Sequence, residues 1–503
     1  MALLDKTFFV AGAAALVLYF FTLRLLSWRR LRHIPGPTSG GWSKFWMARH
    51  QVSGKMCLTL EAVCDKYGPL TRIGPNYVVC NDPAEIKRIW SVHSGYSRSR
   101  WYNGYRIDPN SDSVLTANEN KEHHRIRTHL LPGYSGRGQG SQEQLIDTQV
   151  TNFIRLVERK YLSDRRHGTR PMDMGAAMQY LTQDVTSAVE FGAPFGYLDA
   201  DADFHGVIAA LESMQLPCSL LALLPPLLAL VKSPLVAPLM PKPTDTTGVG
   251  RLLGLVRDLV GERYGDSKKH NPDALQAFVE SGLSRGEVEA EALVHLLGGS
   301  DTTATALRNA VFYLSTHPRS YRRLQAEIDA AAAGGGVARP VIADAEAGKL
   351  PFLQACIKET LRMWPPISGL MPKVSDRDDV VCGVAVPAGT NVAWAAFGVM
   401  KNRAVFGADA GVFEPMRWIE ADAEQLKEME ATQGLVFAGG TRWDCLGKKL
   451  AYAEMGKVIF EIFLRFDFSM TDPIKPFTWF NQGFTQHEHM NVTITKRETT
   501  VAP

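Results

Sequence analysis

The N-terminal segment combines a long apolar run with a group of basic residues that follows it. No charged residue occurs from Thr7 to Leu23, and the apolar run continues past Arg24 to Trp28. A helix over these twenty-two residues would be roughly 33 Å long, against about 30 Å for the hydrocarbon core of a bilayer. Arg24 lies near its end, where a long side chain can extend to the interface. The sequence therefore predicts a membrane-spanning helix, which divides the chain into an anchor and the part that follows it.

The residues after the apolar run predict on which side of the membrane the remaining chain folds. Three arginines and a histidine occur within residues 29–33, and the Pro-Gly-Pro sequence at 35–37 would end the helix. By the positive-inside rule, this basic flank stays in the cytosol. A cleaved signal peptide is the alternative, but it carries its basic residues before the apolar run and a small-residue cleavage site after it. We therefore expect residues 1–33 to form an anchor with a stop-transfer segment, and residues 34–503 to form a cytosolic catalytic domain.

Composition narrows the class of protein further. Hydrophobic residues make up 45% of the chain and charged residues 21%, as in folded proteins. Lys and Arg exceed Asp and Glu by 55 − 52 = 3, so the chain lacks the basic field that binds nucleic acid. The seven cysteines are scattered, with no CxxC pair or zinc-type spacing. These features indicate a reducing compartment, no disulfide framework and no nucleic-acid partner.

Most of the chain has helical periodicity, and strands are few. Residues 70–73 and 77–80 are rich in strand-forming side chains and flank a Gly-Pro-Asn turn, so they predict a hairpin. A second hairpin is expected between Val384–Val386 and Asn391–Trp394, around Pro-Ala-Gly. Long helices are expected over residues 142–161, 285–316, 318–333 and 446–466. The expected fold class is mainly α with small β-sheets.

Residues 217–241 are very apolar but contain six prolines, at 217, 225, 226, 234, 238 and 241. Prolines at this density exclude a continuous helix across the bilayer. The segment suits an interfacial loop that touches the membrane, or a lid over an apolar pocket, and a buried core segment is the alternative.

Near the C-terminus, a glycine-rich loop from Phe437 to Gly447 leads directly into an apolar-periodic helix. Cys445 lies just before that helix, where the positive helix end and backbone N–H groups favour a thiolate. A thiolate can bind haem iron, and the glycines let the backbone approach a porphyrin closely. Taken alone, such a cysteine is more often a small buried apolar residue, so the loop by itself does not decide the question.

A second unusual segment interrupts the long helix expected over residues 285–316. It contains Gly298, Gly299, Asp301 and Thr302, and each glycine costs about 1 kcal/mol relative to alanine in a helix. An acid next to an alcohol can deliver protons to a bound oxygen species. The alternative, a threonine hydroxyl that bonds back to a helix carbonyl, accounts for Thr302 but not for Asp301 or the glycines.

Taken together, these motifs resemble the cytochrome P450 family. Glu359-Thr-Leu-Arg362 lies on a helix that ends at two prolines, Arg417 follows in Phe-Glu-Pro-Met-Arg-Trp, and Cys445 comes 445 − 359 = 86 residues after the glutamate. The resemblance covers the whole chain, and segments such as HIPGP and CLGKKLAYAEMGK are most similar to fungal microsomal members that tailor secondary metabolites. It implies the cytochrome P450 fold after a single N-terminal transmembrane helix, with haem b as cofactor.

The resemblance also implies a role for each motif. Cys445 would be the axial ligand of the haem iron, and the two glycines would open a groove for oxygen in the helix above the haem. Asp301 and Thr302 would deliver protons for cleavage of the O–O bond. The structural triad beneath the haem would comprise Glu359, Arg362 and Arg417.

The cysteine loop departs from the family pattern. The family usually has Phe-x-x-Gly-x-Arg-x-Cys-x-Gly, with arginine two residues before cysteine, whereas Arg442 lies three before Cys445. Phe437 and Gly440 are displaced by one residue as well, so one inserted residue between Arg442 and Cys445 accounts for all three displacements. The alternative alignment places Trp443 at the arginine position. The loop residues expected at the haem are Phe437, Gly440, Arg442, Cys445 and Gly447.

Further basic residues are expected to bind the haem propionates. His123 and Arg127 are four residues apart on a predicted helix and match the family's aromatic-x-x-x-Arg pair, with histidine in place of tryptophan. Lys373 lies where many members have another basic propionate partner. A solvated basic helix face is the alternative for the first pair.

The function implied by the resemblance is that of a haem-thiolate monooxygenase. It would insert one oxygen atom from O₂ into a lipophilic small molecule by hydroxylation, epoxidation or multistep oxidation, as a tailoring step of fungal secondary metabolism. Electrons would come from NADPH through NADPH–cytochrome P450 reductase, with cytochrome b5 as a second donor, and the enzyme would be a single-pass protein of the endoplasmic reticulum that faces the cytosol. An O₂-independent haem-thiolate isomerase or dehydratase, and a non-catalytic membrane haem protein, are the alternatives.

The same layout implies where substrate and reductase would bind. Substrate would contact residues 102–115, the helix around His295 and Leu296, Ile367–Met371 and Phe480–Thr485. These segments are mostly apolar, which favours a lipophilic substrate. A basic docking face for an acidic flavoprotein, with ordinary solvated charge as the alternative, would comprise Arg442, Lys448, Lys449 and Lys457.

Overall fold

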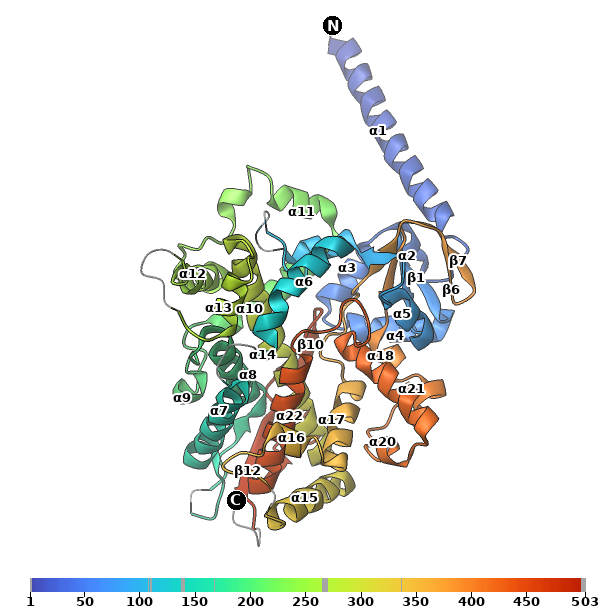
Figure 1. Ribbon diagram of the computed structural model, residues 1–503. Coiled ribbons are helices and arrows are strands. Elements are labelled where there is room, and N and C mark those ends of the chain that lie inside the picture. Colours follow the sequence, from blue (N-terminus) through green and yellow to red (C-terminus); the bar gives the residue numbers. More distant parts are fainter. Residues whose placement is uncertain are drawn as a thin grey trace.

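The computed structural model describes the chain from residue 2 to residue 498 with a few short gaps. The described ranges are 2–106, 108, 111–136, 141–166, 168–264, 270–335 and 337–498, and residues 2–11, 13 and 16 are described by their backbone alone. Helices make up most of the described chain, and small sheets lie beside them (Figure 1). The expected class, mainly α with small β-sheets, is confirmed.

The helices follow one another along the described part of the chain and include three short 3-10 helices and one π-helical turn (η2). They are α1 Ala2–Arg30, α2 Thr38–Trp42, α3 Phe45–Val52, α4 Met56–Tyr67, α5 Pro83–Trp90, η1 Arg100–Tyr105, α6 Asn120–Tyr134, α7 Gln142–Leu156, η2 Val157–Tyr161, α8 Met174–Phe191, α9 Tyr197–Ala200, α10 Val207–Leu223, α11 Pro225–Val231, η3 Ala237–Leu239, α12 Gly248–Gly261, α13 Ala274–Glu280, α14 Arg285–Thr316, α15 Pro318–Ala333, α16 Asp344–Ala347, α17 Pro351–Met363, α18 Ala396–Met400, α19 Arg403–Phe406, α20 Arg417–Glu420, α21 Ala423–Gln433, η4 Gly434–Phe437 and α22 Lys448–Arg465. The four long helices predicted from periodicity are all present.

The central helix is α14, and its start follows from a capping box. The Ser284 hydroxyl accepts from the Glu287 N–H, and the Glu287 carboxylate accepts from the Ser284 N–H at 2.8 Å. With 32 residues, α14 is about 48 Å long, and it packs against α8, α17 and α22. It therefore crosses the domain, and residues along it contact most of the other layers.

The strands form four small sheets. The largest has the order β1-β2-β8-β5-β3 and the second β4-β12-β9, while β10-β11 and β6-β7 are two-stranded. The strands are β1 Leu70–Gly74, β2 Tyr77–Cys80, β3 Tyr96–Arg98, β4 Met172–Asp173, β5 Lys373–Ser375, β6 Asp379–Val381, β7 Val384–Val386, β8 Asn391–Trp394, β9 Phe466–Met470, β10 Thr478–Asn481, β11 Thr485–Glu488 and β12 Asn491–Lys496.

One predicted hairpin is confirmed and the other is wrong. β1 and β2 pair antiparallel, with Leu70 opposite Cys80. β7, however, pairs with β6, while β8 pairs in parallel with β2 and antiparallel with β5. The turn between β6 and β7 is Cys382-Gly383, with φ of 50° and 74°. Positive φ at both turn residues matches the twist of antiparallel strands, which favours pairing of β6 with β7.

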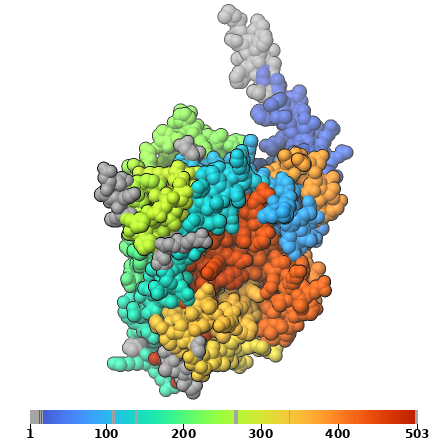
Figure 2. All heavy atoms as spheres, in the orientation of Figure 1, coloured from blue at the N-terminus to red at the C-terminus, as the bar shows by residue number. Residues whose placement is uncertain are grey.

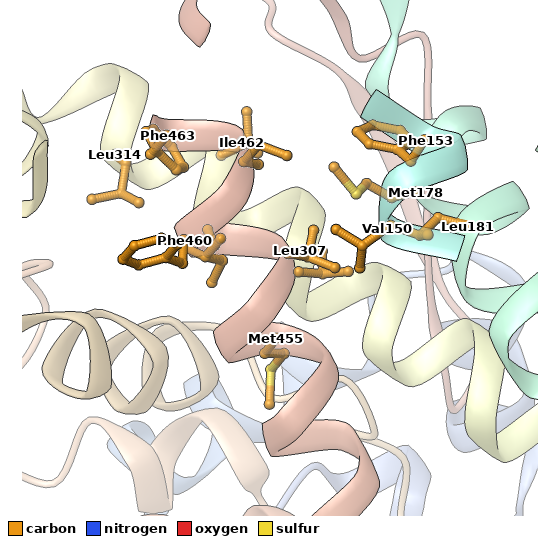
Figure 3. Packing of buried hydrophobic residues seen from close by; sticks show 14 of the residues in the cluster. Val150, Phe153, Met178, Leu181, Leu307, Leu314, Met455, Phe460, Ile462 and Phe463 are labelled. Atoms are coloured by element: carbon orange, nitrogen blue, oxygen red, sulfur yellow. The ribbon is translucent and has the colours of Figure 1, made fainter. Parts of the chain in front are cut away.

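The largest hydrophobic core lies between α14, α22, α7 and α8. Figure 3 shows Leu307 of α14 between the side chains of α22 and those of the α7–α8 pair. Phe460 and Phe463 of α22 are fully buried, and burial of such a side chain contributes roughly 1.5–3 kcal/mol. This core holds α22, and with it the loop that carries Cys445, against the central helix.

The N-terminal helix α1 covers the predicted apolar run from Thr7 to Trp28 and ends at Arg30, within the predicted anchor segment 1–33. Its last turn is attached to the domain, because the Trp28 ring stacks on Trp42 at 5.4 Å and the Trp28 carbonyl accepts from Arg72 at 3.0 Å. Figure 2 shows the described part of α1 extending beyond the rest of the molecule. The side chains of residues 2–11, 13 and 16 lie outside the described part.

The described helices differ in whether they could cross a membrane. No single described helix is long and apolar enough to cross a bilayer, and only α10 and α11, bent by 118° at the break between them, pass together by length and composition. The transmembrane helix therefore stays a prediction.

The proline-rich segment 217–241 is divided between interior and surface. Its first part completes α10, where Ala222 and Leu223 are buried. The remainder forms α11 and η3, which have no buried residue, and Leu235 and Leu239 are 86% and 78% exposed. The buried-core alternative thus holds only up to Leu223. In Figure 1, α11 lies on the same upper side of the molecule as α1.

Candidate functional site

The Cys445 loop is closed by short-range contacts just before α22. The Cys445 N–H donates to the Phe437 carbonyl at 2.8 Å, and the Phe437 ring lies 5.3 Å from the Tyr452 ring. Two loop residues have left-handed backbone, with φ of 51° at Ala438 and 71° at Gly440. Gly440 adopts this conformation without strain, whereas an L side chain does not, so the glycine is required there by the shape of the loop.

The electrostatics of Cys445 are balanced between opposing effects. Burial raises the pKa of its thiol above the ordinary value, and the neighbouring Asp444 carboxylate raises it further. The Gly447 N–H and the Arg127 and Lys448 charges lower it. The predicted stabilisation of a thiolate by the helix start is thus present, but it is smaller than the cost of burial. The side chain still has a free surface through which a ligand could reach the sulfur.

Five basic side chains surround a buried region next to this loop. Burial and the charges of Arg98, Arg127, Lys373 and Arg442 lower the pKa of His123 to about 2. His123 is buried and its Nδ1 has no hydrogen-bond partner in the described chain. The structure therefore brings together all the predicted propionate partners, and it adds Arg98, which carries no motif in the sequence.

The charges of this basic cluster are not paired with carboxylates. The arginines donate to backbone carbonyls: Arg98 to Val114, Arg127 to Asp444 and Arg442 to Val92. Among the residues that the structure describes, no ion pair to a carboxylate is found for Arg98, Arg127, Lys373 or Arg442. A cluster of positive charge with no ion-paired carboxylate among the described residues fits a ligand that brings carboxylates of its own.

Lys373 is enclosed most completely. It is 1% exposed, donates to the Tyr102 hydroxyl at 3.1 Å, and lies 4.7 Å from the centre of the Trp90 ring and 4.5 Å from that of Trp443. Burial, with Arg98 nearby, lowers the pKa of Lys373 well below its usual range. Trp443, the alternative occupant of the arginine position in the loop, thus packs on one cation of the basic cluster, whereas Arg442 supplies another.

The chemistry of this donor set fits haem. Cys445 offers sulfur to iron just before α22, and Arg98, Arg127, Lys373 and Arg442 offer positive charge to two propionates, while His123, neutral because of its lowered pKa, offers a ring N–H. Thiolate and cations lie close enough to interact, since the charge of Arg127 acts on Cys445. The roles of these residues toward haem, and of Phe437, Gly440 and Gly447 in the loop, stay predictions.

The residues of the predicted triad form a buried ionic network. Arg362 donates to both oxygens of Glu359, at 2.8 and 2.7 Å, and Arg417 donates to Glu359 at 3.0 Å. Glu359 and Arg362 are fully buried, and Trp418 donates to the same carboxylate at 2.9 Å. Glu359 and Arg362, three residues apart on one helix, therefore form a pair inside the protein and not a solvated pair on its surface. The network joins α17 to the segment around α20.

The acid–alcohol pair lies in the middle of α14. The Thr302 hydroxyl donates to the Gly298 carbonyl at 2.7 Å, the back-bonded arrangement that the alternative interpretation requires. Asp301 is 3% exposed, and its Oδ2 accepts from the Gln215 amide at 3.3 Å. Burial raises the pKa of Asp301 to about 6, against the opposing effects of Arg308 and Gln215. An acid with a pKa near neutrality can both hold and release a proton.

The two glycines before this pair have different surroundings. A methyl group on Gly299 would lie 2.8 Å from the Thr186 hydroxyl, so Gly299 allows α14 to approach α8 closely. A methyl group on Gly298 would meet nothing within 4 Å. Packing thus explains Gly299, whereas the space beside Gly298 remains open for a ligand.

An apolar cavity lies next to this part of α14. The room it offers to water-sized molecules is about 40 Å³, and the space not filled by atoms reaches about 470 Å³ when the open mouth is included. Of the predicted substrate segments, 102–115 and 480–485 contribute to its wall; residues 107, 109 and 110 lie outside the described chain. The lining residues are Tyr105, Leu115, Leu211, Met214, Gln215, Cys218, Leu293, Val294, Leu297 and Phe484.

The other predicted substrate segments differ in their relation to this cavity. Ile367–Met371 is not part of its described wall. The helix around His295 and Leu296 does line it, through Leu293, Val294 and Leu297. His295 itself is buried on another face of α14, where its ring lies 4.9 Å from that of Tyr134, since neighbouring helix positions point about 100° apart. Substrate contact by these segments stays a prediction.

Sequence reasoning missed the contribution of α10. Four of the lining residues, among them Gln215 and Cys218, belong to this helix. The sequence carries no clear signal for Gln215, because Glu212, Ser213 and Ser219 are polar residues of the same helix.

One residue of the predicted docking face is not on the surface. Lys457 is fully buried and forms ion pairs with Glu143 at 2.8 Å and Asp147 at 2.7 Å. Its charge is therefore neutralised inside the protein, and it is removed from the docking face. Lys449 is exposed and Lys448 is half-buried, so the remaining basic residues before and in the first turn of α22 are available.

Comparisons with known proteins agree with this site. The cytochrome P450 family model matches residues 35–493. The chain is similar to cytochrome P450 monooxygenase ABA1 of Pyricularia oryzae, with 38% identity over 499 residues that cover 97% of each chain. It is also similar to cytochrome P450 monooxygenase aba1 of Botryotinia fuckeliana, with 35% identity over 93% of each chain. Cytochrome P450 monooxygenase abl1 of Leptosphaeria maculans is 34% identical over 92% of this chain and 82% of its own length.

Members of this family hold their haem iron by a cysteine thiolate, and the relatives are named monooxygenases. Cys445 lies within the matched region, in a glycine-rich loop before a helix. The chain belongs to the cytochrome P450 family and is a haem-thiolate monooxygenase.

Proposed function

We propose that this enzyme inserts one oxygen atom from O₂ into a lipophilic small molecule, as a tailoring step of fungal secondary metabolism. The observation that carries the proposal is the apolar cavity, because its wall includes Leu293, Val294 and Leu297 of α14 within ten residues before Asp301 and Thr302. A substrate in the cavity would lie beside the groups that handle protons. The fungal origin of the relatives and the resemblance to fungal tailoring enzymes support the metabolic role.

The balanced reaction is R–H + O₂ + 2 e⁻ + 2 H⁺ → R–OH + H₂O, and the chain has groups for the proton part of it. Haem, when bound, supplies the oxygen-activating chemistry. Asp301 can carry protons because its pKa is about 6, and Gln215 fixes one of its oxygens. Thr302 keeps its hydroxyl oriented by the bond to Gly298. Arg308 is anchored to the Gly175 carbonyl at 2.9 Å and keeps a positive charge near Asp301.

The proposal is tested with the purified, haem-loaded enzyme, a reductase and NADPH. A panel of lipophilic compounds is first screened for spectral binding, and products are then analysed by mass after reaction under ¹⁸O₂. The expected result is a product that carries one ¹⁸O atom, with Thr302→Ala producing more hydrogen peroxide. A product that forms equally without O₂ would establish an isomerase or dehydratase instead. If no compound increases NADPH consumption, a non-catalytic haem protein becomes the better interpretation.

The thiolate assignment has its own test. The reduced, carbon-monoxide-bound enzyme should show the strongly red-shifted Soret band of a thiolate ligand, and Cys445→Ser should lose it while Cys356→Ser keeps it. Cys356 is a suitable control because it is fully buried in α17. A red-shifted band that persists in Cys445→Ser would remove Cys445 as the ligand.

We further propose that α1 anchors the enzyme in the endoplasmic reticulum membrane with residues 34–503 in the cytosol. The exposed apolar surface of α11 and η3, on the same upper side of the molecule in Figure 1, supports this because it would contact the bilayer as well. Enzyme lacking residues 1–33 should be released from microsomes by alkaline carbonate, whereas full-length enzyme should stay bound. Protection of the domain from added protease in intact microsomes would contradict the cytosolic orientation.

Electrons are proposed to come from NADPH–cytochrome P450 reductase, with cytochrome b5 as a second donor. The available basic residues near the haem loop, Arg442, Lys448 and Lys449, support an acidic partner. Lys449→Glu should lower the rate of reduction by reductase more at low than at high salt, and Lys457→Met, which changes a buried cation, should lack this salt dependence. Equal salt dependence in the two variants would contradict the docking face.

A further inference from the structure

Gln215 belongs to the wall of the apolar cavity and is also hydrogen-bonded to Asp301. It is one of the residues that line the apolar cavity, and its amide donates to Asp301 at 3.3 Å. It is 3% exposed and lies on α10, whereas Asp301 lies on α14. The contact therefore joins the wall of the substrate cavity to the acid in the middle of the central helix.

The position of Asp301 depends on this contact. Asp301 Oδ1 has no partner in the described chain, so the Gln215 amide supplies its one described side-chain hydrogen bond. The charged groups near Asp301 are Arg308 on α14 and Glu212 on α10. Arg308 donates to the Gly175 carbonyl and to the Gln179 amide oxygen. Its charge attracts the Asp301 carboxylate, but no hydrogen bond between the two is found among the described residues.

Gln215 can respond to what occupies the cavity. Leu211, Met214 and Cys218 line the cavity from the same helix, so an occupant that contacts them also presses on the turn that carries Gln215. Pro217 lies inside α10 and has no N–H to donate, so the hydrogen-bond ladder is interrupted beside this turn. The turn that carries Gln215 is therefore held by fewer backbone hydrogen bonds than a turn of an unbroken helix.

We infer that Gln215 is a positioning residue that makes proton delivery by Asp301 depend on the molecule in the cavity. The inference rests on the proposed function where it concerns a substrate in the cavity. The hydrogen bond between Gln215 and Asp301 does not depend on that function. With a fitting substrate, Gln215 keeps its bond to Asp301, and the carboxylate stays in place to hold and release protons. With a poorly fitting molecule, the turn of α10 that carries Gln215 shifts and the Asp301 carboxylate loses its hydrogen bond. Electrons from NADPH then reduce O₂ to hydrogen peroxide and no product forms.

The first test measures coupling with the full-length, haem-loaded enzyme and reductase. Gln215→Leu keeps the volume and apolar character of the wall but removes the amide. Substrate dissociation constants should change less than threefold, while hydrogen peroxide formed per NADPH should rise at least fivefold. Ser213→Ala is the matched control, since Ser213 is exposed on α10 and its hydroxyl donates only to the Ala210 carbonyl. A variant that is merely misfolded would lose haem and substrate binding together, and unchanged coupling in Gln215→Leu would overturn the inference.

The second test needs no turnover, and so separates this inference from the proposed function. The infrared carboxyl band that is absent in Asp301→Asn reports the protonation of Asp301 during a pH titration. Because the Gln215 hydrogen bond lowers the pKa of Asp301, the midpoint should lie near 6 in the wild type and higher in Gln215→Leu. A neutral lipophilic ligand that gives a binding spectrum should move the midpoint in the wild type but not in Gln215→Leu. Identical midpoints in the two proteins, with and without ligand, would refute the coupling.

Discussion

Gly298 and Gly299 are adjacent on α14 and should respond oppositely to the same substitution. Alanine in place of glycine in a helix interior stabilises by about 1 kcal/mol where the methyl group fits. At Gly298 it meets nothing within 4 Å, so the full gain is expected. At Gly299 it would lie 2.8 and 3.0 Å from two atoms of Thr186, and such overpacking costs about 1–3 kcal/mol. Gly299→Ala should therefore be up to about 2 kcal/mol less stable than the wild type.

These free energies correspond to small but measurable shifts in Tm. Unfolding entropy of about 2.1 cal/mol/K per residue gives about 1 kcal/mol/K for 503 residues, so 1 kcal/mol shifts Tm by about 1 °C. By calorimetry of the haem-loaded enzyme, Gly298→Ala should melt about 1 °C above the wild type and Gly299→Ala up to about 2 °C below it. Thr186→Ala should restore most of the loss in Gly299→Ala, because it removes the two atoms that the methyl group meets.

Activity should not follow stability in this pair. Gly298 is the residue whose carbonyl accepts from Thr302, and a methyl group there enters the open space beside that contact. Gly298→Ala should therefore be the more stable and the less active enzyme, with lower product yield per NADPH. Equal Tm shifts in the two variants, or no rescue by Thr186→Ala, would refute the packing argument for Gly299.

Three further predictions concern other parts of the chain. Arg417→Gln leaves Glu359 with one charged partner fewer in a buried network, so Tm should fall by about 3–5 °C for a cost of about 3–5 kcal/mol, with a parallel loss of bound haem; an unchanged Tm would contradict this. Glu291→Gln should flatten the pH dependence of stability. Burial raises the pKa of Glu291 to about 8, so at pH 7 the folded state holds a proton that the unfolded state has released. The free energy of unfolding of the wild type should therefore fall by about 1 kcal/mol between pH 7 and pH 9. Chemical denaturation at the two pH values should show no such loss in the variant. Ala438→Gly should change Tm by less than about 1 °C in calorimetry, because relief of the left-handed backbone of φ 51° is offset by the loss of a buried methyl group and by the greater freedom of glycine in the unfolded chain.

Local signals were sufficient to predict the long helices. α14 and α15 have the predicted bounds because each start is marked in the sequence, by the Ser284–Glu287 capping box and by Pro318 at the first position. The hairpin predicted between β7 and β8 failed for the opposite reason. The true partner of β8 is β2, which lies far away in the sequence, and pairing at that distance leaves no local signal.

The same distinction applies to the site. Glu359 and Arg362 could be predicted as an ion pair because both residues lie on one helix at a spacing that places them on one face. Gln215 and Arg98 could not, because their importance arises from contacts with α14 and with the basic cluster that only the folded chain creates. Sequence motifs therefore located the chemistry, whereas the wall of the cavity and the full set of cations depend on tertiary structure.

The basic cluster also links cofactor binding to folding. Burial lowers the pKa of Lys373 well below its usual range and that of Arg98 to about 10, so the folded chain bears a cost for each of these charges. A carboxylate placed among them would raise both pKa values again, and each unit of change is worth about 1.4 kcal/mol. Two propionates bind only the folded arrangement, since the cations come from β3, α6, β5 and the Cys445 loop. Haem should therefore stabilise the fold through this cluster as well as through the iron–sulfur bond, and loss of the thiolate alone should leave part of that stabilisation in place.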